Sequence, residues 1–294
     1  MNRFLSLDIG GTFIKYGLFD KEGKEYFSHK EGTEKEPEEF FNQLLKIIEK
    51  VERIDSFKGI SISIGGFINP VTGENTDFSV GKNFTTYNLK NKIKEYKGYN
   101  VAIENDANCA ALAELWIGEG KGISDFIVIT LGTGIGGAII SEGRLLRGKS
   151  FKAGEFGLMY LGREKKASGI EYKSPYATYT LVNKISKALG KQVDGEYIFD
   201  NLDNKTINLI YEEWLTDIAL IFGNIAICFD PERILLGGGV SSQERLIDDL
   251  QRKVYEIYPH LSEYTSIKTC KLKNNAGMLG AVRNYLNEYE NHKA

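Results

Sequence analysis

The sequence has few cysteines, no long apolar run and no marked excess of charge of either sign. Its three cysteines, Cys109, Cys228 and Cys270, lie far apart, which argues against a disulfide framework or a cysteine-based metal site and for a reducing compartment. No apolar stretch approaches the roughly 18 residues that a membrane-spanning helix needs. Because 37 basic residues stand against 40 acidic ones, the basic excess typical of nucleic-acid-binding domains is missing. We therefore expect neither a membrane nor a nucleic acid as a partner.

The beginning of the chain and its histidines exclude further classes. MNRFLSLDIGG has one basic residue before a glycine-rich segment, which is not the pattern of a secretory signal peptide. The three histidines, His29, His260 and His292, show no spacing that suggests a catalytic triad or a metal site. With 42% hydrophobic and 26% charged residues in 294, the composition is that of a globular protein of one large domain or two. We expect a cytoplasmic protein.

Glycine is abundant, and the placement of the 32 glycines organises the chain. A strand, a glycine turn and a second strand are predicted twice, in FLSLDIGGTFIKYGLF at residues 4–19 and in FIVITLGTGIGGAII at residues 126–140. Between them, a helical spacing of apolar residues begins at Pro37, and strand-like runs occupy residues 59–66 and 100–104. This alternation predicts an α/β fold with two similar domains, each built around one hairpin.

The first glycine turn, in DIGGTFIK, carries residue types that suit an anion and a metal ion. Gly10 and Gly11 lack a Cβ, so backbone N–H groups can approach an anion, while Thr12 adds a hydroxyl and Lys15 a positive charge. Asp8, at the end of the outgoing strand, could hold Mg²⁺ directly or through water. A plain hairpin with a glycine turn would give the same pattern.

The second glycine turn repeats these features, with Gly132, Thr133 and Gly134 between two apolar strands. Neither turn is a Walker A loop or a Rossmann fingerprint, since each leads into a strand and not a helix. Two such turns in one chain favour a clamp on a nucleotide polyphosphate, one turn from each domain. Gly238 and Gly239 follow another apolar strand; they would let a flat ring or a ribose lie on bare backbone, although a tight strand–helix turn explains them as well.

Two carboxylates are candidates for acid–base or binding roles. Asp106, beside Asn105 in VAIENDANCAALAELW, stands at the predicted N-cap of a helix, where capping would contribute about 1 kcal/mol. It also follows the carboxyl end of a strand, where α/β proteins bind ligands, and this favours a general base acting on an alcohol. Capping and catalysis are compatible. Glu155 in GEFG is either an exposed turn residue or a carboxylate presented to a polyol.

Taken in order, DIGGTFIKYGLFD, IENDANCAALAE, ITLGTGIGGAII, GEFG and ILLGGGVS resemble the ROK family of bacterial sugar kinases and sugar-responsive repressors. The resemblance extends from residue 4 to about residue 283. It implies the actin-like (ribonuclease H-like) α/β fold of two domains, with ATP and sugar in the cleft between them. It places the sugar site and the first phosphate loop in a domain of residues 1–110 plus about 277–294. A second domain of residues 111–276 would hold the other phosphate loop, the adenosine site and the homodimer interface.

The same resemblance assigns roles to individual residues. Asp106 becomes the base that accepts the proton of a sugar hydroxyl, usually the one on carbon 6. Asn83 in KNFTTYNL, Asn105 and Glu155 match sugar ligands of the family, and Glu171 in SGIEYKSPYA matches a further family glutamate. The residues assigned to ATP are Gly10, Gly11 and Thr12 in one phosphate loop, Gly132, Thr133 and Gly134 in the other, and Gly238 and Gly239 beside the adenosine.

This chain departs from the family at one side of the sugar site. The family continues GExGH, with a histidine that touches the sugar and binds zinc, whereas here Leu158 stands in that place. The cysteine-rich loop that follows in the family is replaced by MYLGREKKASGIE, so we expect no structural zinc. An apolar wall near carbons 1 and 2 should discriminate less between a free and a substituted anomeric hydroxyl. This favours a β-glucoside such as cellobiose, with glucose, fructose and N-acetylmannosamine as alternatives.

Two other classes of function compete with a sugar kinase. A repressor of the same family would carry a helix-turn-helix ahead of the first hairpin, but only seven residues precede Asp8. A non-catalytic sugar-sensing regulator would not need Asp106 together with both phosphate loops. An actin-like ATPase that moves a partner would need insertions for which 294 residues leave little room. The sequence therefore favours the kinase.

Overall fold

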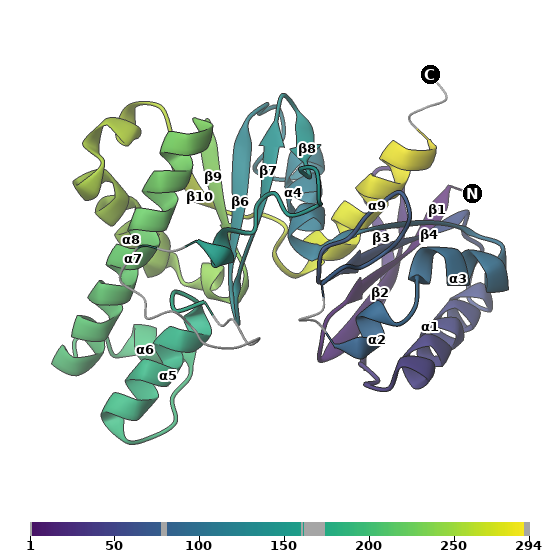
Figure 1. The fold of residues 1–294 in the computed structure, drawn as a ribbon, viewed down its shortest axis with the longest axis horizontal. Coiled ribbons are helices and arrows are strands. Elements are labelled where there is room, and N and C mark those ends of the chain that lie inside the picture. Colours follow the sequence, from purple (N-terminus) through teal and green to yellow (C-terminus); the bar gives the residue numbers. More distant parts are fainter. Residues whose placement is uncertain (1, 78–80, 160, 162–173, 291–294) are drawn as a thin grey trace. The chain divides into compact units, whose positions relative to one another are not determined.

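The computed structural model describes residues 2–77, 81–159, 161 and 174–290, which form two compact units, each with a five-stranded sheet (Figure 1). The first unit contains Met1–Lys121, Arg147–Ala153 and Asn274–Ala294, and the second contains Gly122–Leu146 and Gly154–Lys273. No helix in the described part of the chain is both long and apolar enough to cross a lipid bilayer.

The sheet of the first unit has the strand order β3-β2-β1-β4-β5. β1 pairs antiparallel with β2 and parallel with β4, and β4 pairs parallel with β5. Every residue of β4 is buried, as expected for a strand that is covered on both faces. Its strands are β1 Arg3–Ile9, β2 Phe13–Asp20, β3 Glu25–Gly32, β4 Gly59–Ile64 and β5 Asn100–Asn105. Its α-helices are α1 Pro37–Glu52, α2 Lys82–Thr85, α3 Leu89–Lys97, α4 Asp106–Ile117 and α9 Ala276–Tyr289.

The second unit repeats the arrangement, with the order β10-β9-β6-β7-β8. β6, β7 and β8 pair antiparallel in turn, and β9 and β10 continue the sheet as parallel strands beside β6. Its strands are β6 Phe126–Leu131, β7 Ile135–Ser141, β8 Arg144–Leu146, β9 Arg233–Gly237 and β10 Ser266–Thr269. Its α-helices are α5 Thr178–Leu189, α6 Gly195–Asp200, α7 Lys205–Phe229 and α8 Glu244–Ile257. Short 3₁₀ helices are η1 Phe156–Leu158, η2 Gly239–Ser242, η3 Pro259–Glu263 and, where the chain returns to the first unit, η4 Lys273–Asn275.

The first unit extends further along the chain than the division at residue 110 predicts. That division falls inside α4, and α4 packs against α9 within the first unit. The unit therefore continues to Lys121, and it also includes the segment Arg147–Ala153 from the middle of the chain. Both the boundary at Lys121 and the inclusion of Arg147–Ala153 depend on contacts between segments that are distant in the chain. A single sequence does not show such contacts.

Helices α4 and α9 approach so closely that one of them needs a glycine at the contact. A Cβ on Gly280 would overlap the main-chain carbonyl group of Cys109 in α4, and backbone cannot move away as a side-chain end can. Gly280→Ala should therefore force the helices apart and lower the free energy of unfolding by about 1–3 kcal/mol. Urea denaturation measures this change.

Gly195→Ala in α6 is the matched control for Gly280→Ala. Apart from the adjoining backbone of its own helix, no heavy atom lies within 4 Å of the position that a Cβ would take at Gly195, so the same chemical change meets open space. Alanine also favours the helical backbone, and the control should be neutral or slightly stabilising. Equal stability of Gly280→Ala and the wild type would contradict the close packing of α4 on α9.

Candidate active site

Three parallel strands of the first unit end side by side at one edge of its sheet. Ile9 of β1 lies opposite Ile64 of β4, and Ile64 lies opposite Asn105 of β5. The segments that follow the strands are the first glycine turn, Gly65–Gly66 and the start of α4. This register brings together DIGG and END, two motifs that are about 100 residues apart in the sequence. The carboxyl ends of parallel strands are where α/β proteins bind ligands.

Asp8 is held in place one residue before this edge. Its Oδ1 accepts a hydrogen bond from the Ser63 hydroxyl at 2.8 Å, and the Nζ of Lys15 lies 3.6 Å from its Oδ2. Lys15 stands opposite Asp8 in the β1–β2 ladder and also donates to the carbonyl oxygen of Asn274 at 3.4 Å. The ammonium predicted to bind phosphate thus forms an ion pair with the Asp8 carboxylate in this structure.

The surroundings of Asp8 suit Mg²⁺ that is held mainly by phosphate oxygens and water. Mg²⁺ usually takes one or two carboxylates from the protein and keeps several waters. Asp8 supplies one carboxylate, with the Ser63 hydroxyl beside it. Within the described ranges, no group of three or more His, Cys, Asp or Glu side chains could hold a metal ion. These donors therefore fit a Mg²⁺ ion that Asp8 holds through water and that phosphate oxygens also bind.

The helix N-cap predicted at Asp106 is made by its neighbour, Asn105. The Oδ1 of Asn105 accepts the backbone N–H groups of Ala107 at 2.9 Å and Asn108 at 3.1 Å, and its Nδ2 donates to the carbonyl oxygen of Gly66 at 3.0 Å. The capping assignment to Asp106 was wrong, because the helix begins one residue earlier than the sequence suggested. Asp106 is instead the first residue of α4, and its side chain is exposed.

The environment of Asp106 makes its carboxylate a stronger base than an ordinary aspartate. Although solvent reaches the side chain, the protein around it reduces its hydration, and this desolvation raises the pKa of the Asp106 carboxyl above its usual value. The negative charge of Asp8 acts in the same direction, while the backbone N–H of Ala107, 2.8 Å from Oδ1, acts against both. A raised pKa and an open side chain are properties of a general base.

A buried ion pair fixes the junction between β5 and α4, and sequence analysis missed it. Glu104 is fully buried; its Oε1 accepts the backbone N–H of Asn105 at 2.8 Å and the Nδ2 of Asn108 at 2.9 Å. The Nε of Arg147 lies 2.6 Å from its Oε2, and the Nη2 of Arg147 donates to the Oδ1 of Asn284 at 3.2 Å. A glutamate inside the apolar run VAIE was the available signal, because a buried carboxylate needs a partner.

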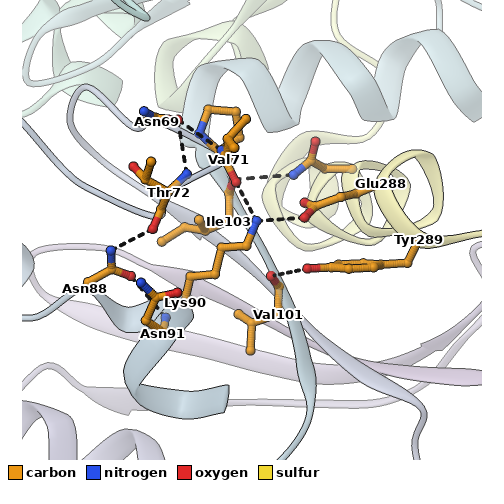
Figure 2. Close-up of polar contacts among 12 residues, drawn as sticks. Asn69, Val71, Thr72, Asn88, Lys90, Asn91, Val101, Ile103, Glu288 and Tyr289 are labelled. Atoms are coloured by element: carbon orange, nitrogen blue, oxygen red, sulfur yellow. Dashed lines mark hydrogen bonds and ion pairs between the residues drawn. The ribbon is translucent and has the colours of Figure 1, made fainter. Parts of the chain in front are cut away.

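Asn83 lies on α2, and the next helix, α3, is anchored to the C-terminal helix. Figure 2 shows Lys90 of α3, whose Nζ donates to the carbonyl oxygen of Pro70 at 2.6 Å and to the Oε1 of Glu288 in α9 at 2.7 Å. The side chain of Asn83 is buried, and its Nδ2 donates to the carbonyl oxygen of Glu34 at 3.0 Å. The amide assigned to the sugar is therefore engaged with the protein.

The second unit contains a pocket of about 510 Å³ beside the second glycine turn. Gly132 and Thr133 of this turn line one part of it, Gly239 lines another, and Val182 and Phe199 contribute apolar surface. The size is typical of pockets for small molecules, and the apolar walls suit a flat ring. The N–H of Tyr179, at the start of α5, donates to the carbonyl oxygen of Gly132 at 3.2 Å and holds the turn in place.

Gly238 and Gly239 differ in what they contribute. Gly239 lines the pocket. Gly238 has φ 87°, and a Cβ there would meet the carbonyl group of Leu131 at the end of β6. Position 238 therefore requires glycine, because its φ is positive and the adjacent strand leaves no room for a Cβ. This agrees with the alternative explanation from the sequence, a tight turn between a strand and a helix.

The GEFG segment lies against strand β7, where glycine is also required. Gly154 has φ 90°, and Cβ atoms on Gly154 or Gly157 would meet the main chain of Gly137 or Ile135. This contact fixes Glu155 at the start of η1, in the second unit. Leu158, at the end of η1, is 50% exposed. Glu171 lies outside the residues that the structure describes.

The fold is that of a two-domain α/β sugar kinase. The chain matches the ROK family over residues 4–287, and it belongs to this family. A β-glucoside kinase of Listeria innocua is 35% identical over 303 aligned positions, which cover 99% of this chain and 100% of the relative. Both the predicted family and the predicted fold class are confirmed.

Solved structures agree with this assignment. A Listeria monocytogenes protein described as a candidate N-acetylmannosamine kinase is 34% identical, with a TM-score of 0.86 over 97% of this chain and 99% of that one. A ROK glucokinase of Streptomyces griseus, solved with glucose and AMPPNP, is 26% identical, with a TM-score of 0.81 over 96% and 98%. The chain is accordingly an ATP-dependent carbohydrate kinase.

Proposed function

We propose that this protein transfers the γ-phosphoryl group of ATP to a hydroxyl of a β-glucoside, with Asp106 as the general base. The observation that carries this proposal is the position of Asp106, an exposed carboxylate of raised pKa. It follows β5 at the sheet edge where the first glycine turn follows β1.

The proposed chemistry relies on positioning and charge neutralisation, because phosphoryl transfer proceeds through a loose transition state. Mg²⁺ held by Asp8 through water would neutralise charge on the phosphate oxygens. The backbone N–H groups of Gly11 and Thr12 in the first glycine turn, and those of Thr133 and Gly134 in the second, would hold the phosphates in line with the sugar, since the N–H groups of Gly10 and Gly132 donate within their own turns. Asp106 accepts the hydroxyl proton as the oxygen forms its bond to phosphorus, and the bond between the γ-phosphorus and the bridging oxygen breaks to release ADP.

We propose a β-glucoside because of the residue at position 158. The exposed Leu158 replaces an imidazole and offers no hydrogen bond, so a site built around it should tolerate a substituted anomeric oxygen. The β-glucoside kinase of Listeria innocua supports this choice. Glucose, fructose and N-acetylmannosamine are the alternative acceptors. Asn83, Asn105, Glu155 and Glu171 are the residues proposed to contact the sugar, and for Asn83 and Asn105 a direct contact would add to the bonds that their amides already make.

A coupled assay of ADP formation with cellobiose, glucose, fructose and N-acetylmannosamine tests the substrate. We expect kcat/KM to be highest for cellobiose, and Leu158→His to shift the preference toward glucose by restoring a polar group. Leu146→His is the matched control, since Leu146 in β8 is also exposed, at 43%. A strong preference of the wild type for free monosaccharides would reject the β-glucoside assignment.

A further inference from the structure

The carbonyl side of the first glycine turn is held by residues 32–35, which we name the support segment. The backbone N–H of Thr33 donates to the carbonyl oxygen of Thr12 at 3.0 Å, and its Oγ1 donates to that of Gly10 at 2.7 Å. The Nζ of Lys35 donates to the carbonyl oxygen of Gly11. Three consecutive carbonyl groups of the turn therefore accept hydrogen bonds from one segment.

These bonds determine the direction of the amide groups in the turn. In a trans peptide unit the C=O and the following N–H point in opposite directions, and the described chain has no cis peptide bond. When the carbonyls of Gly10, Gly11 and Thr12 point to the support segment, the N–H groups of Gly11, Thr12 and Phe13 point away from it. Residues 10–13 are exposed, so these N–H groups can meet an anion.

The support segment is itself fixed by α1 and α2. The Oε1 of Gln43 in α1 accepts the N–H of Glu34 at 3.1 Å, and its Nε2 donates to the carbonyl oxygen of Gly32 at 2.6 Å. Asn83 in α2 donates to the carbonyl oxygen of Glu34 at 3.0 Å. The support segment thus contacts both the expected phosphate loop and a residue expected at the sugar.

We propose that Thr33 is a positioning residue for phosphate binding. Its buried hydroxyl and its N–H hold two carbonyls of the turn, and this aims the N–H groups of the turn at the triphosphate. Asn83 assists Thr33 by holding the support segment at Glu34. This proposal rests on the proposed function only in taking the first glycine turn as a phosphate loop.

Thr33→Val tests this role, because it removes the hydroxyl donor and keeps the backbone N–H and the branched shape. Isothermal titration without sugar measures the dissociation constants of Mg·ATP and of adenosine, which lacks phosphates. A lost hydrogen bond of about 1 kcal/mol corresponds to about a fivefold weaker binding of ATP. Adenosine should bind as to the wild type, and Thr33→Ser should restore ATP binding.

Two results would overturn the positioning role: unchanged ATP binding by Thr33→Val, or an equal loss for ATP and adenosine, which would indicate a general effect on folding. Because this titration contains no sugar, its outcome is independent of the sugar assay. Unchanged ATP binding by Thr33→Val would reject the positioning role alone. A lack of sugar-dependent ADP formation by the wild type would reject the kinase proposal.

Discussion

Asp106→Asn should lower kcat by about 10²–10⁴-fold, the usual contribution of a general base. Asparagine has the shape of aspartate, and its Oδ1 can still accept the Ala107 N–H that Asp106 accepts at 2.8 Å. It cannot take up the proton of a sugar hydroxyl. The dissociation constants of ATP and sugar should therefore change little, and steady-state kinetics with isothermal titration will separate the two effects.

Asp203→Asn is the matched control for Asp106→Asn, since Asp203 is an exposed aspartate of the second unit. This control should retain the kcat of the wild type. An Asp106→Asn variant that keeps more than about a tenth of wild-type kcat would be incompatible with general-base catalysis by Asp106.

The raised pKa of Asp106 also predicts how activity and stability depend on pH. Since the base must be ionised, kcat/KM should fall as the pH drops through a value above that of an ordinary aspartate. The folded state binds this proton more tightly than the unfolded state, so ionisation of Asp106 disfavours folding. Asp106→Asn should thus be at least as stable as the wild type at pH 7. Melting temperatures should show this advantage fading as the pH falls through the raised folded-state pKa toward the unfolded value.

Arg147→Met should lower the free energy of unfolding by about 3–5 kcal/mol, the usual cost of leaving a buried charge without its partner. Glu104 is fully buried, and Arg147 is its cationic partner at 2.6 Å. Methionine keeps much of the length and apolar stem of arginine, so the change isolates the guanidinium group. Because Glu104 also accepts the N–H of Asn105, next to Asp106, we expect kcat to fall as well.

Two further variants show whether the cost of Arg147→Met comes from the buried charge. Arg144→Met, at an exposed arginine in β8, should change stability by less than about 0.5 kcal/mol. Adding Glu104→Gln to Arg147→Met should recover part of the lost stability, because no unpaired charge then remains. If the double variant is no more stable than Arg147→Met, the ion pair does not account for the loss. Urea denaturation gives the free energy of unfolding of the wild type, the two single variants and the double variant.

Local patterns in the sequence were sufficient for several elements of this fold, but not for β3, α2 or α3. Glycine turns between apolar runs predicted the two hairpins, and a helical spacing after Pro37 predicted α1, which begins at that residue. The motif around Asp106 predicted a strand followed by a helix. Turn formation and amphipathic periodicity depend on neighbours in the chain, so one sequence displays them.

The contacts that support the site could not be predicted in this way. Glu104 and Arg147 are 43 positions apart, and Thr33 and Gly10 are 23 apart, so their partners are set by how the strands pair. The N-cap of α4 shows a finer limit. Asn105 and Asp106 are both good capping residues, and only the backbone, extended at Asn105 and helical from Asp106, decides between them.

The most direct test of the account is ADP release by the purified protein with Mg·ATP, measured with and without a saccharide. The account predicts little ADP without sugar, a large increase with cellobiose, and no such increase for Asp106→Asn. ADP release by the wild type that no saccharide in the panel accelerates, or an equal acceleration in Asp106→Asn, would contradict it.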